Sequence, residues 1–453
     1  MANNDCILIA GAGPVGMTTA LALSKAGIPV KVFDALAEIP ADHRASTLHP
    51  STLMLLENLD MTSELIRRGI QSPLFQWRDR MSDRIVAEFD YRDISDVLTY
   101  PYALQLEQHK TIEIAHDIAV AIDGFELYRE RELSELSQDD DGVEVRVQAP
   151  DGSTETHRGK FLVGADGGKS AVRKLLDINF PGFTWEERFI IVSTYYDFEE
   201  AAGYRYRNYV AHPEQWCAMI KVPGEQDEGV WRALFPAFGD RPDEYLLSDE
   251  WIQARFAECY PYDPPYDLLH RNLYSVHQRV AESFAKGRVA LAGDAAHVNN
   301  PLGGMGMNSG IHDGLNLAEK LVIAWHGGDH DILLSRYDRQ RRPMAEKYVQ
   351  AQSIANKRLL EENDPEAREK RLKELEFTAT DAEAKRDYLM RASLMQMLEE
   401  AKAIEQIASF VPLSATPAPN YGSQDLVARD RVREEVDPFD TQELPSHQPT
   451  YRK

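Results

Sequence analysis

Near the N-terminus, two short runs of apolar residues flank a segment in which apolar residues recur at helical spacing. The runs CILIA and VKVFD predict buried strands at residues 6–10 and 30–34, and PVGMTTALALSKAG between them predicts a helix that ends near Gly27. A strand, a glycine-rich turn, a helix and a second strand form a βαβ unit, whose strands pair in parallel. TLMLLENL, at residues 52–59, predicts a further helix.

The middle of the chain is strand-prone. Alternating valines in GVEVRVQ, residues 142–148, and a turn at residues 150–152 predict a hairpin whose return strand runs into residues 161–164. Residues 183–279 are rich in aromatic and strand-forming segments such as RFIIVSTYYDF, which indicates an inserted sheet. RVALAGD, residues 288–294, returns to the pattern of a buried strand.

Helical periodicity dominates after residue 310. Apolar side chains recur there at steps of three and four on one face, namely Ile311, Leu315, Ala318, Val322 and Trp325. Residues 336–406 are helical and heavily charged, and EENDPEAREKRLKELE is typical of a solvated helix face. From residue 412 the chain is rich in Pro, Ser, Asp and Gln, which predicts an extended tail.

Composition and charge narrow the classes of partner. The 453 residues carry a formal net charge of -24, which argues against nucleic acid and anionic membranes as main partners. No apolar run is long enough for a membrane span, and no basic region of a signal peptide is visible, so we expect a cytoplasmic protein. Cys6, Cys217 and Cys259 show neither disulfide nor metal-ligand spacing, so we expect no metal site.

The sequence GAGPVG lies between the first strand and the first helix, which is the context that a dinucleotide-binding turn requires. Its glycines permit a tight turn, the approach of a pyrophosphate and close packing of helix on strand. Asp34 ends the second strand, where a carboxylate can accept hydrogen bonds from ribose hydroxyls. The alternative is a structural turn without a ligand. The motif residues expected to contact the cofactor are Gly11, Gly13, Pro14, Val15 and Gly16.

A second glycine-rich stretch, GDAAHVNNPLGGMGMNSG, occupies residues 293–310 and directly precedes a helix. Asp294 ends a buried strand, so its carboxylate is placed either to bind a sugar-alcohol chain or to cap a turn. The following backbone N–H groups and the helix dipole favour an anionic cofactor. We therefore expect cofactor contacts from Gly293, Asp294, Pro301, Gly304, Gly306, Met307 and Asn308.

Three further segments resemble the flavoprotein aromatic hydroxylases, the class A FAD-dependent monooxygenases typified by p-hydroxybenzoate hydroxylase. They are HRASTLHPSTLMLLENL, VGADGGKSAVRKLL and RVALAGDAAHVNNPLGGMGMN, and they follow GAGPVG in the order and at the spacing of that family. The resemblance covers about the first 330 residues. It implies FAD as cofactor, NADPH or NADH as electron donor, molecular oxygen and a small aromatic substrate. It also implies hydroxylation of a phenolic or heteroaromatic ring through a flavin C4a-hydroperoxide.

The resemblance assigns roles to four more residues. Arg44 is expected near the flavin, and Gln108 matches a glutamine that contacts FAD, with Gln105 as a competing alignment. Asp166 is expected either to shape the region where the nicotinamide approaches or to hold a turn. Arg173 is expected either to organise that loop or to be an exposed helix charge.

The fold class expected from these patterns is α/β, with a Rossmann-type FAD-binding domain, an inserted β-sheet substrate domain and a helical C-terminal region. We expect the FAD-binding domain at residues 1–182 and 280–330, the substrate-binding sheet at residues 183–279, helices at residues 331–411 and the tail at residues 412–453. A second copy of the chain, in a homodimer, is one expected partner.

Catalytic groups are harder to identify from the sequence. His297 and Pro301 follow the Gly-Asp motif, and a tyrosine of the insert is expected to hydrogen-bond the phenol, with Tyr204 and Tyr206 as first choices. Spacing does not separate these two from the other candidates, which are Tyr195, Tyr196, Tyr209 and His212, with His49 as a further one.

Two other functions compete with the hydroxylase. The first is a related FAD-dependent dehydrogenase or oxidase that inserts no oxygen, and the second is a non-enzymatic flavin-fold binding protein. A flavin halogenase is disfavoured because the sequence has no Trp-x-Trp motif. The absence of a second dinucleotide motif and of paired redox cysteines argues against the two-nucleotide disulfide reductases.

Overall fold

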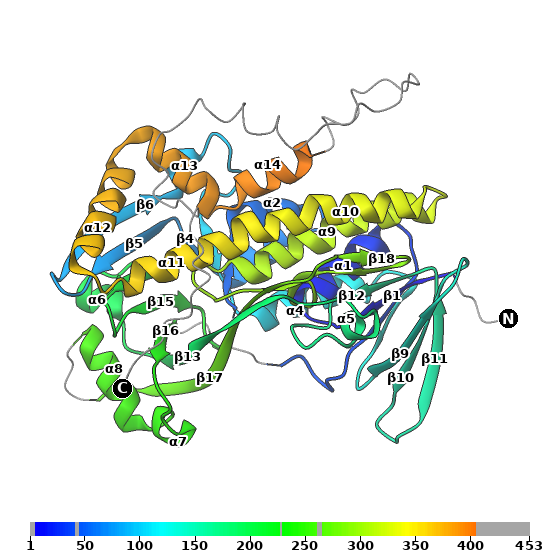
Figure 1. Cartoon of the computed structure of the whole chain (residues 1–453), viewed down its shortest axis with the longest axis horizontal. Helices are drawn as coiled ribbons and strands as arrows, with labels where there is room; N and C mark the ends of the chain where they lie inside the picture. Colours follow the sequence, from blue (N-terminus) through cyan, green and yellow to red (C-terminus); the bar gives the residue numbers. More distant parts are fainter. Residues whose placement is uncertain (1–4, 41–44, 227–228, 261–264, 405–453) are drawn as a thin grey trace, which may run out of the picture.

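A computed structural model describes residues 5–40, 45–226, 229–260 and 265–404. Figure 1 shows two large sheets side by side, beneath long helices. The first sheet has six strands in the order β18-β19-β12-β1-β2-β8, all parallel except for the β18–β19 pair. Its strands are β1 (Ile7–Ala10), β2 (Val30–Phe33), β8 (Phe125–Tyr128), β12 (Phe161–Gly164), β18 (Ala285–Lys286) and β19 (Val289–Leu291). The predicted βαβ unit is confirmed, because β1, α1 (Pro14–Lys25) and β2 follow one another and β1 pairs with β2 in parallel.

Helix α9 (Met305–Trp325) crosses α1 with almost no space between the two backbones. A Cβ on Gly314 would lie 2.2 Å from Thr19 Oγ1, and a Cβ on Gly310 would lie 2.7 Å from Val15 Cγ2. A side chain at either position would force a neighbouring group to move. Part of the glycine content of residues 293–310 therefore serves the packing of α9 on α1.

The second large sheet has eight strands in the order β20-β17-β13-β16-β15-β14-β5-β6. Most of it comes from the predicted insert: β13 (Gly182–Thr194), β14 (Arg207–Ala211), β15 (Cys217–Val222), β16 (Val230–Ala237) and β17 (Leu268–Val280). Three strands come from outside residues 183–279: β5 (Leu74–Asp79), β6 (Arg84–Asp90) and β20 (His297–Val298). The sheet is wider than expected because β14 pairs in parallel with β5, which the sequence assigned to the first domain.

The predicted hairpin needs one correction. A separate antiparallel sheet contains β9 (Glu132–Gln138), β10 (Val143–Gln148) and β11 (Thr154–Gly159). The return strand ends at Gly159, and the next segment, β12, pairs with β1 in the parallel sheet. The alternation of valines correctly predicted the hairpin, but it could not show that the chain passes into a different sheet between residues 159 and 161.

Short elements connect the two large sheets. A third small sheet has the order β3-β7-β4, with β3 (Thr47–Leu48), β4 (Ile70–Ser72) and β7 (Ala103–Gln105). The helices of this half are α2 (Pro50–Glu57), α3 (Thr62–Arg68), α4 (Gln108–Ala119) and α5 (Ala171–Leu175). One face of the eight-stranded sheet, which we call the outer face, carries α6 (Phe198–Ala202), α7 (Asp243–Leu246) and α8 (Asp249–Cys259). Two 3-10 turns, η1 (Tyr91–Ile94) and η2 (Gly293–Ala295), complete the connections.

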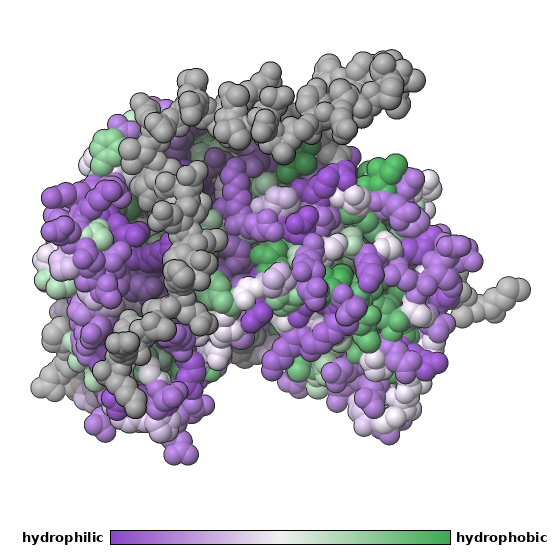
Figure 2. Space-filling model, in the orientation of Figure 1, coloured by the Kyte–Doolittle hydropathy of each residue, from purple (hydrophilic) through white to green (hydrophobic). Residues whose placement is uncertain are grey.

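The expected helical C-terminal region is present. It consists of α10 (His330–Met344), the π-helical turn η3 (Ala345–Gln350), α11 (Ala351–Glu361), α12 (Pro365–Thr380), α13 (Ala382–Ala392) and α14 (Met395–Ala403). Helix α10 runs beside α9, and α12 and α13 lie over β5 and β6 at the left of Figure 1. Hydrophilic side chains cover most of the face seen in Figure 2. Within the described residues no helix combines the length and the apolar character of a membrane span. The predicted tail at residues 412–453 lies outside the described residues.

Candidate active site

The first glycine motif forms a compressed turn between β1 and α1. Gly11 has φ +99°, and a Cβ there would lie 2.3 Å from the carbonyl oxygen of Ala165. A Cβ on Gly16 would lie 1.9 Å from the carbonyl oxygen of Gly11. These two positions exclude side chains because backbone segments approach each other, as a dinucleotide-binding turn requires.

The space in front of this turn is open. Gly13 is the N-cap of α1, and a Cβ there would meet no atom within 4 Å. Helix α1 has no side-chain cap and no acidic residue in its first turn, and the same holds for α9. Both helices therefore leave backbone N–H groups and positive partial charge available for an anionic group.

Asp34 closes the turn from the side of β2. Its carboxylate accepts hydrogen bonds from the backbone N–H groups of Ala12 (2.6 Å) and Leu36 (2.8 Å). Arg129 Nη1 lies 3.8 Å from Asp34 Oδ1. The carboxylate thus orients the glycine turn, and a bound ribose would share it with these N–H groups.

The Gly-Asp motif lies at the end of β19, in the 3-10 turn η2. Asp294 is exposed although Gly293 and Ala295 on either side of it are buried. A carboxylate directed out of a buried turn is the arrangement expected of a cofactor contact. Arg173 fixes this turn, because its Nη1 donates to the carbonyl oxygen of Ala295 (2.8 Å) and its Nη2 to that of Gly168 (2.9 Å).

The contacts of Asp166 and Arg173 distinguish between the alternatives expected for each residue. Asp166 accepts hydrogen bonds from Ser170 Oγ (2.6 Å) and from the backbone N–H of Val172, so it holds the turn into α5. Arg173 is 5% exposed and stacks on Phe180, with Cζ 3.8 Å from the ring centre. Arg173 is therefore an organising residue of the loop and not an exposed helix charge.

A buried charge cluster lies beneath the Gly-Asp motif. Asp313 on α9 accepts a hydrogen bond from Arg341 Nε (2.6 Å) on its Oδ1, while its Oδ2 lies 2.8 Å from His297 Nε2 and 3.2 Å from the backbone nitrogen of Gly293. Burial alone would raise the pKa of Asp313, but Arg341 and His297 outweigh burial and hold the pKa below its usual range. The His297 ring is fully buried, so this geometry gives it a positioning role.

Hydrogen bonds from His49 and Asn308 hold the loop between β20 and α9 in place. His49 Nε2 lies 2.8 Å from the carbonyl oxygen of Gly303, and the His49 backbone N–H donates to Asn308 Oδ1 (2.8 Å). Asn308 Nδ2 donates to the carbonyl oxygens of Thr47 and Gly304, both at 2.7 Å. The Asn308 side chain, expected to contact the cofactor, thus ties the first turn of α9 to β3.

The residues before this loop shape the turn. The fully buried Asn300 accepts the N–H of Leu302 (3.1 Å), and its own N–H donates to Gln278 Oε1 on β17 (3.0 Å). The carbonyl oxygen of Pro301 accepts the N–H of Gly304 (3.0 Å). Gly304 has φ +67° and directly precedes α9.

Leu302 shows which face of the eight-stranded sheet the loop meets. It packs with an aromatic cluster that includes Phe75, Trp77, Phe189 and Tyr209. We call this the inner face of the sheet. Because side chains alternate along a strand, Arg207 on β14 shares the inner face with Tyr209.

Arg207 is the most unusual group on the inner face. It is 4% exposed, and Nε and Nη1 have no hydrogen-bond partner among the described residues. Burial, followed by the charge of Arg207, lowers the pKa of His49 to about 3, so His49 is neutral at physiological pH. No sequence motif marks Arg207. Strand alternation in YRYRNYVA would have placed it beside Tyr209, but no pattern indicates which face meets the cofactor.

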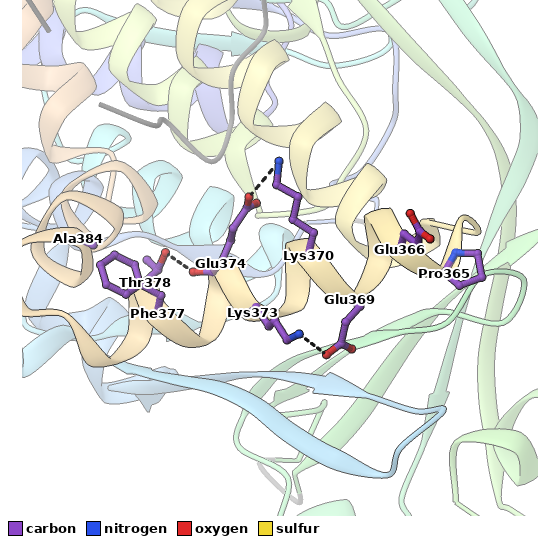
Figure 3. Close-up of a pocket in the computed structure, with 9 residues that line it drawn as sticks. All are labelled: Pro365, Glu366, Glu369, Lys370, Lys373, Glu374, Phe377, Thr378 and Ala384. Carbon is purple, nitrogen blue, oxygen red and sulfur yellow. Dashed lines mark hydrogen bonds and ion pairs between the residues drawn. The ribbon is translucent and has the colours of Figure 1, made fainter. Parts of the chain in front are cut away.

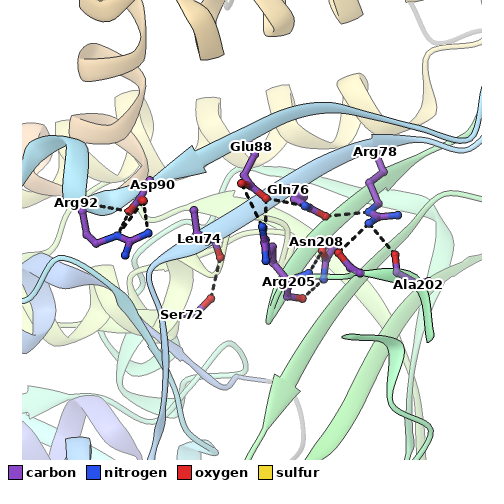
Figure 4. A network of polar contacts seen from close by, with 11 residues as sticks. Ser72, Leu74, Gln76, Arg78, Glu88, Asp90, Arg92, Ala202, Arg205 and Asn208 are labelled. Carbon is purple, nitrogen blue, oxygen red and sulfur yellow. Dashed lines mark hydrogen bonds and ion pairs between the residues drawn. The ribbon is translucent and has the colours of Figure 1, made fainter. Parts of the chain in front are cut away.

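Tyr204 and Tyr206 require a correction, because the structure does not bring them to this site. Tyr204 packs with Phe198 and Trp231 in the cluster on the outer face, where burial raises its pKa well above the usual value. Tyr206 lies beside Lys221, whose Nζ is 5.3 Å from the ring centre. Figure 4 shows the outer-face polar network between β5, β6 and β14. The insert was correctly expected to form a sheet, but its two faces could not be distinguished.

The other candidate site residues lie in different parts of the structure. Tyr196 belongs to the outer cluster, and Tyr195 is 48% exposed. Gln105 is fully buried and accepts Thr47 Oγ1 (2.7 Å), while Gln108 begins α4 and is partly exposed, so the two alignments stay open. Arg44 lies outside the described residues.

A surface hollow of about 860 Å³ lies far from these motifs, along α12 (Figure 3). Its lining comes from α12 and from Ala384 of α13 and includes the ion pairs Lys370–Glu374 and Lys373–Glu369. None of the glycine-rich motifs reaches it. The candidate active site is therefore the region between the glycine motifs and the inner face.

Comparison with known proteins identifies the family of the chain. A family model described as FAD binding domain matches residues 5–352. Para-nitrophenol 4-monooxygenase of Pseudomonas sp. (strain WBC-3) is 31% identical over 393 residues, which cover 85% of this chain and 94% of the relative. The 6-hydroxy-3-succinoylpyridine 3-monooxygenase of Pseudomonas putida (strain DSM 28022 / S16) is 29% identical over 366 residues, or 81% and 91% of the two chains.

A solved structure gives the same result. The crystal structure of p-nitrophenol 4-monooxygenase from Pseudomonas putida DLL-E4 matches with a TM-score of 0.81 and 29% identity, covering 88% of this chain and 98% of that one. The chain therefore belongs to the FAD-binding-domain family, and it is an FAD-dependent monooxygenase of the aromatic hydroxylase class. Its residues fit FAD, because Gly13 faces open space, α1 and α9 begin without side-chain caps, and Asp294 projects from a buried turn.

Proposed function

We propose that this enzyme hydroxylates a small phenolic compound, with NADPH or NADH as electron donor and molecular oxygen as the source of the inserted atom. The observation that carries the proposal is that the loop of residues 301–304 lies between two different kinds of surface. On one side lie the uncapped N-termini of α1 and α9, and on the other lies the aromatic inner face. A nitrophenol is the first substrate to test, because two of the similar proteins are named for one.

Bound FAD would supply the redox chemistry, and the chain would position it. Gly11, Gly13 and the N-terminus of α1 would hold the pyrophosphate, and Asp34 the ribose. Asp294 would bind the ribityl chain beside the start of α9. These assignments follow from the open space at Gly13 and from the exposure of Asp294.

The chain would also exclude water from the reacting ring. Leu302 of the glycine-rich loop packs with the inner-face aromatic residues, and together they form an apolar surface next to Gly303 and Gly304. A dry site favours transfer of oxygen to the substrate over release of hydrogen peroxide. A phenol bound there would present its ring to the loop at Gly303 and Gly304.

Labelled oxygen tests the proposal directly. Purified protein containing FAD is mixed with 4-nitrophenol, other phenols and heteroaromatic acids in turn, with NADPH or NADH, under isotopically labelled O₂. The expected result is substrate-stimulated oxidation of one donor and a product that carries the label. Donor oxidation that yields only hydrogen peroxide with every substrate would support the oxidase alternative, and a protein that binds no FAD would contradict both readings.

Assembly and compartment stay predictions. We propose a cytoplasmic enzyme that forms a homodimer, and light scattering of the purified holoenzyme tests the second part. A molar mass close to that of one 51.3 kDa chain would contradict it.

A further inference from the structure

We propose that Arg207 binds an oxygen anion carried by the aromatic substrate and so holds the substrate ring against the inner face of the sheet. This inference rests on the proposed function and deepens it, because it specifies the class of substrate. It predicts that the enzyme prefers rings with an ionised oxygen over neutral analogues of the same shape.

Aromatic rings surround the Arg207 guanidinium, and the Tyr91 side chain also forms a hydrogen bond with it. The Cζ of Arg207 lies 4.2 Å from the ring centre of Phe75, 5.7 Å from that of Tyr91 and 5.9 Å from that of Tyr209. Cation–π contacts stabilise a guanidinium through its flat faces, but they leave the N–H groups at its edge without acceptors. In Arg207, Nε and Nη1 are in this state among the described residues.

Three other buried arginines each have a carboxylate or carbonyl acceptor, although Arg368 also has one nitrogen, Nη1, without a hydrogen-bond partner. Arg341 donates to Asp313, Arg368 pairs with Asp79, and Arg173 donates to the carbonyl oxygen of Ala295. Within the described part of the chain, no carboxylate forms an ion pair with Arg207. A buried charge without a counter-charge is costly, and such a group in a native protein calls for an explanation such as a ligand.

The chemistry of the edge selects an oxygen anion. The N–H groups of a guanidinium form a rigid fork that matches the paired lone pairs of an anionic oxygen or a carboxylate. The charge of Arg207 helps to lower the pKa of His49, so His49 is neutral and does not compete with Arg207 for an anion. His49 also binds the carbonyl oxygen of Gly303, so the Arg207 site adjoins the loop where the cofactor is expected.

Aromatic neighbours supply the surface on which the ring of such a substrate would lie. Tyr209 stacks on Trp77, with ring centres 4.5 Å apart, and Phe75 stacks on Phe89 at 5.3 Å. All four side chains are buried on the inner face. Tyr388 of α13 also stacks on Phe75 and Phe89. A planar ring packed against this cluster would gain stacking contacts, while Arg207 would fix its orientation.

The test measures ligand binding to the holoenzyme through the perturbation of the flavin absorbance spectrum, without turnover. The probes are 4-nitrophenol at a pH where it is ionised and 4-nitroanisole, its neutral methyl ether. Arg207→Met is expected to weaken binding of 4-nitrophenolate about 10- to 100-fold, the range for a hydrogen bond to a charged group, and to leave binding of 4-nitroanisole within about threefold. Arg207→Lys keeps the charge without the fork and should restore part of the loss.

The matched control is Arg78→Met. Arg78 also stacks on a tyrosine, with Cζ 4.1 Å from the ring centre of Tyr204, but on the outer face and with hydrogen bonds to the carbonyl oxygens of Ala202 and Gly203. It should leave both affinities unchanged. A third probe, 4-methoxybenzoate, separates a carboxylate from a phenolate as the bound anion, because only the anion that Arg207 binds should lose affinity in Arg207→Met.

Two results would overturn the inference. One is an equal loss for 4-nitrophenolate and 4-nitroanisole in Arg207→Met, which would mean that Arg207 only supports the fold. The other is equal affinity of the unmodified enzyme for the two probes, and this measurement decides the matter even if Arg207→Met does not retain FAD. Failure of the proposed function would appear differently, as normal ligand binding without labelled product.

Discussion

Arg341 on α10 donates a hydrogen bond of 2.6 Å to Asp313 on α9, and both side chains are fully buried. The second oxygen of Asp313 binds His297 and the backbone N–H of Gly293. One carboxylate therefore connects the C-terminal helices to the turn from which Asp294 projects. The conformation of the turn that carries Asp294 is therefore stabilised by three buried side chains, Asp313, Arg341 and His297.

Replacement of Asp313 should destabilise the protein and weaken FAD retention together. Asp313→Asn leaves Arg341 buried without its counter-charge, which costs about 3–5 kcal/mol. Chemical denaturation and FAD titration measure the two effects. Glu369→Gln, which breaks an exposed pair with Lys373 on α12, is the control and should change neither. Normal FAD affinity in a destabilised Asp313→Asn protein would separate the cluster from the site.

Two buried histidines should make the fold sensitive to mild acid. Burial lowers the pKa of both His49 and His312 to about 3, with Arg207 and Arg341 respectively as the next cause. The unfolded chain binds these protons near pH 6.5, so the stabilisation is complete above that pH and is lost as the pH falls towards 3. Each histidine adds about 1.4 kcal/mol per pH unit to the slope between these limits.

The measurement is the free energy of unfolding between pH 7.5 and pH 5. His312→Gln keeps a hydrogen-bonding group near Thr52 Oγ1, which lies 3.0 Å from His312 Nε2, and should flatten the slope. His326→Gln, at an exposed position after α9, should leave the slope as it is. An unchanged slope in His312→Gln would show that His312 takes up its proton in the folded state.

Loss of the Asp294 carboxylate should weaken FAD binding with the fold intact. One charge-assisted contact contributes about 1.5–3 kcal/mol, so Asp294→Ala is expected to lower FAD affinity by at least tenfold. Flavin fluorescence measures the affinity, and the melting temperature of the apoprotein reports on the fold. Asp331→Ala, at an exposed position in the first turn of α10, is the matched variant. If FAD affinity does not change in Asp294→Ala, Asp294 only shapes its turn.

The outer face contains a pair of cysteines that the sequence spacing did not reveal. Cys217 Sγ lies 3.1 Å from Cys259 Sγ, although 42 positions separate them. Burial raises the pKa of Cys217, so its thiol stays protonated and reacts slowly. Diamide should nevertheless join the two residues, because the second thiol is already in contact. Peptide mass spectrometry would detect the cross-link, and Cys259→Ser should abolish it; two freely alkylated thiols after oxidation would contradict the prediction.

The sequence by itself determined the βαβ unit, the glycine-rich turn within it and the family of the protein. Local spacing was sufficient to predict the βαβ unit, because one turn, one helix and two strands follow one another within residues 7–33. The packing of α1 against α9 and α4 could not be predicted in this way. The glycines at residues 11 and 16 showed where backbone segments must approach, since no side chain fits there. The order of the later motifs was sufficient for the family.

Only the tertiary structure decided which side chains surround the substrate region. Tyr204, which precedes β14, packs in the outer-face cluster, whereas Arg207, the first residue of β14, lies on the inner face. Asp313 and Arg341 form an ion pair although they lie on separate helices. Strand β5 pairs with β14 although more than a hundred residues of chain separate them. Strand alternation places side chains on alternate faces, but the packing of the whole sheet against the glycine-rich loop determines which face becomes the site.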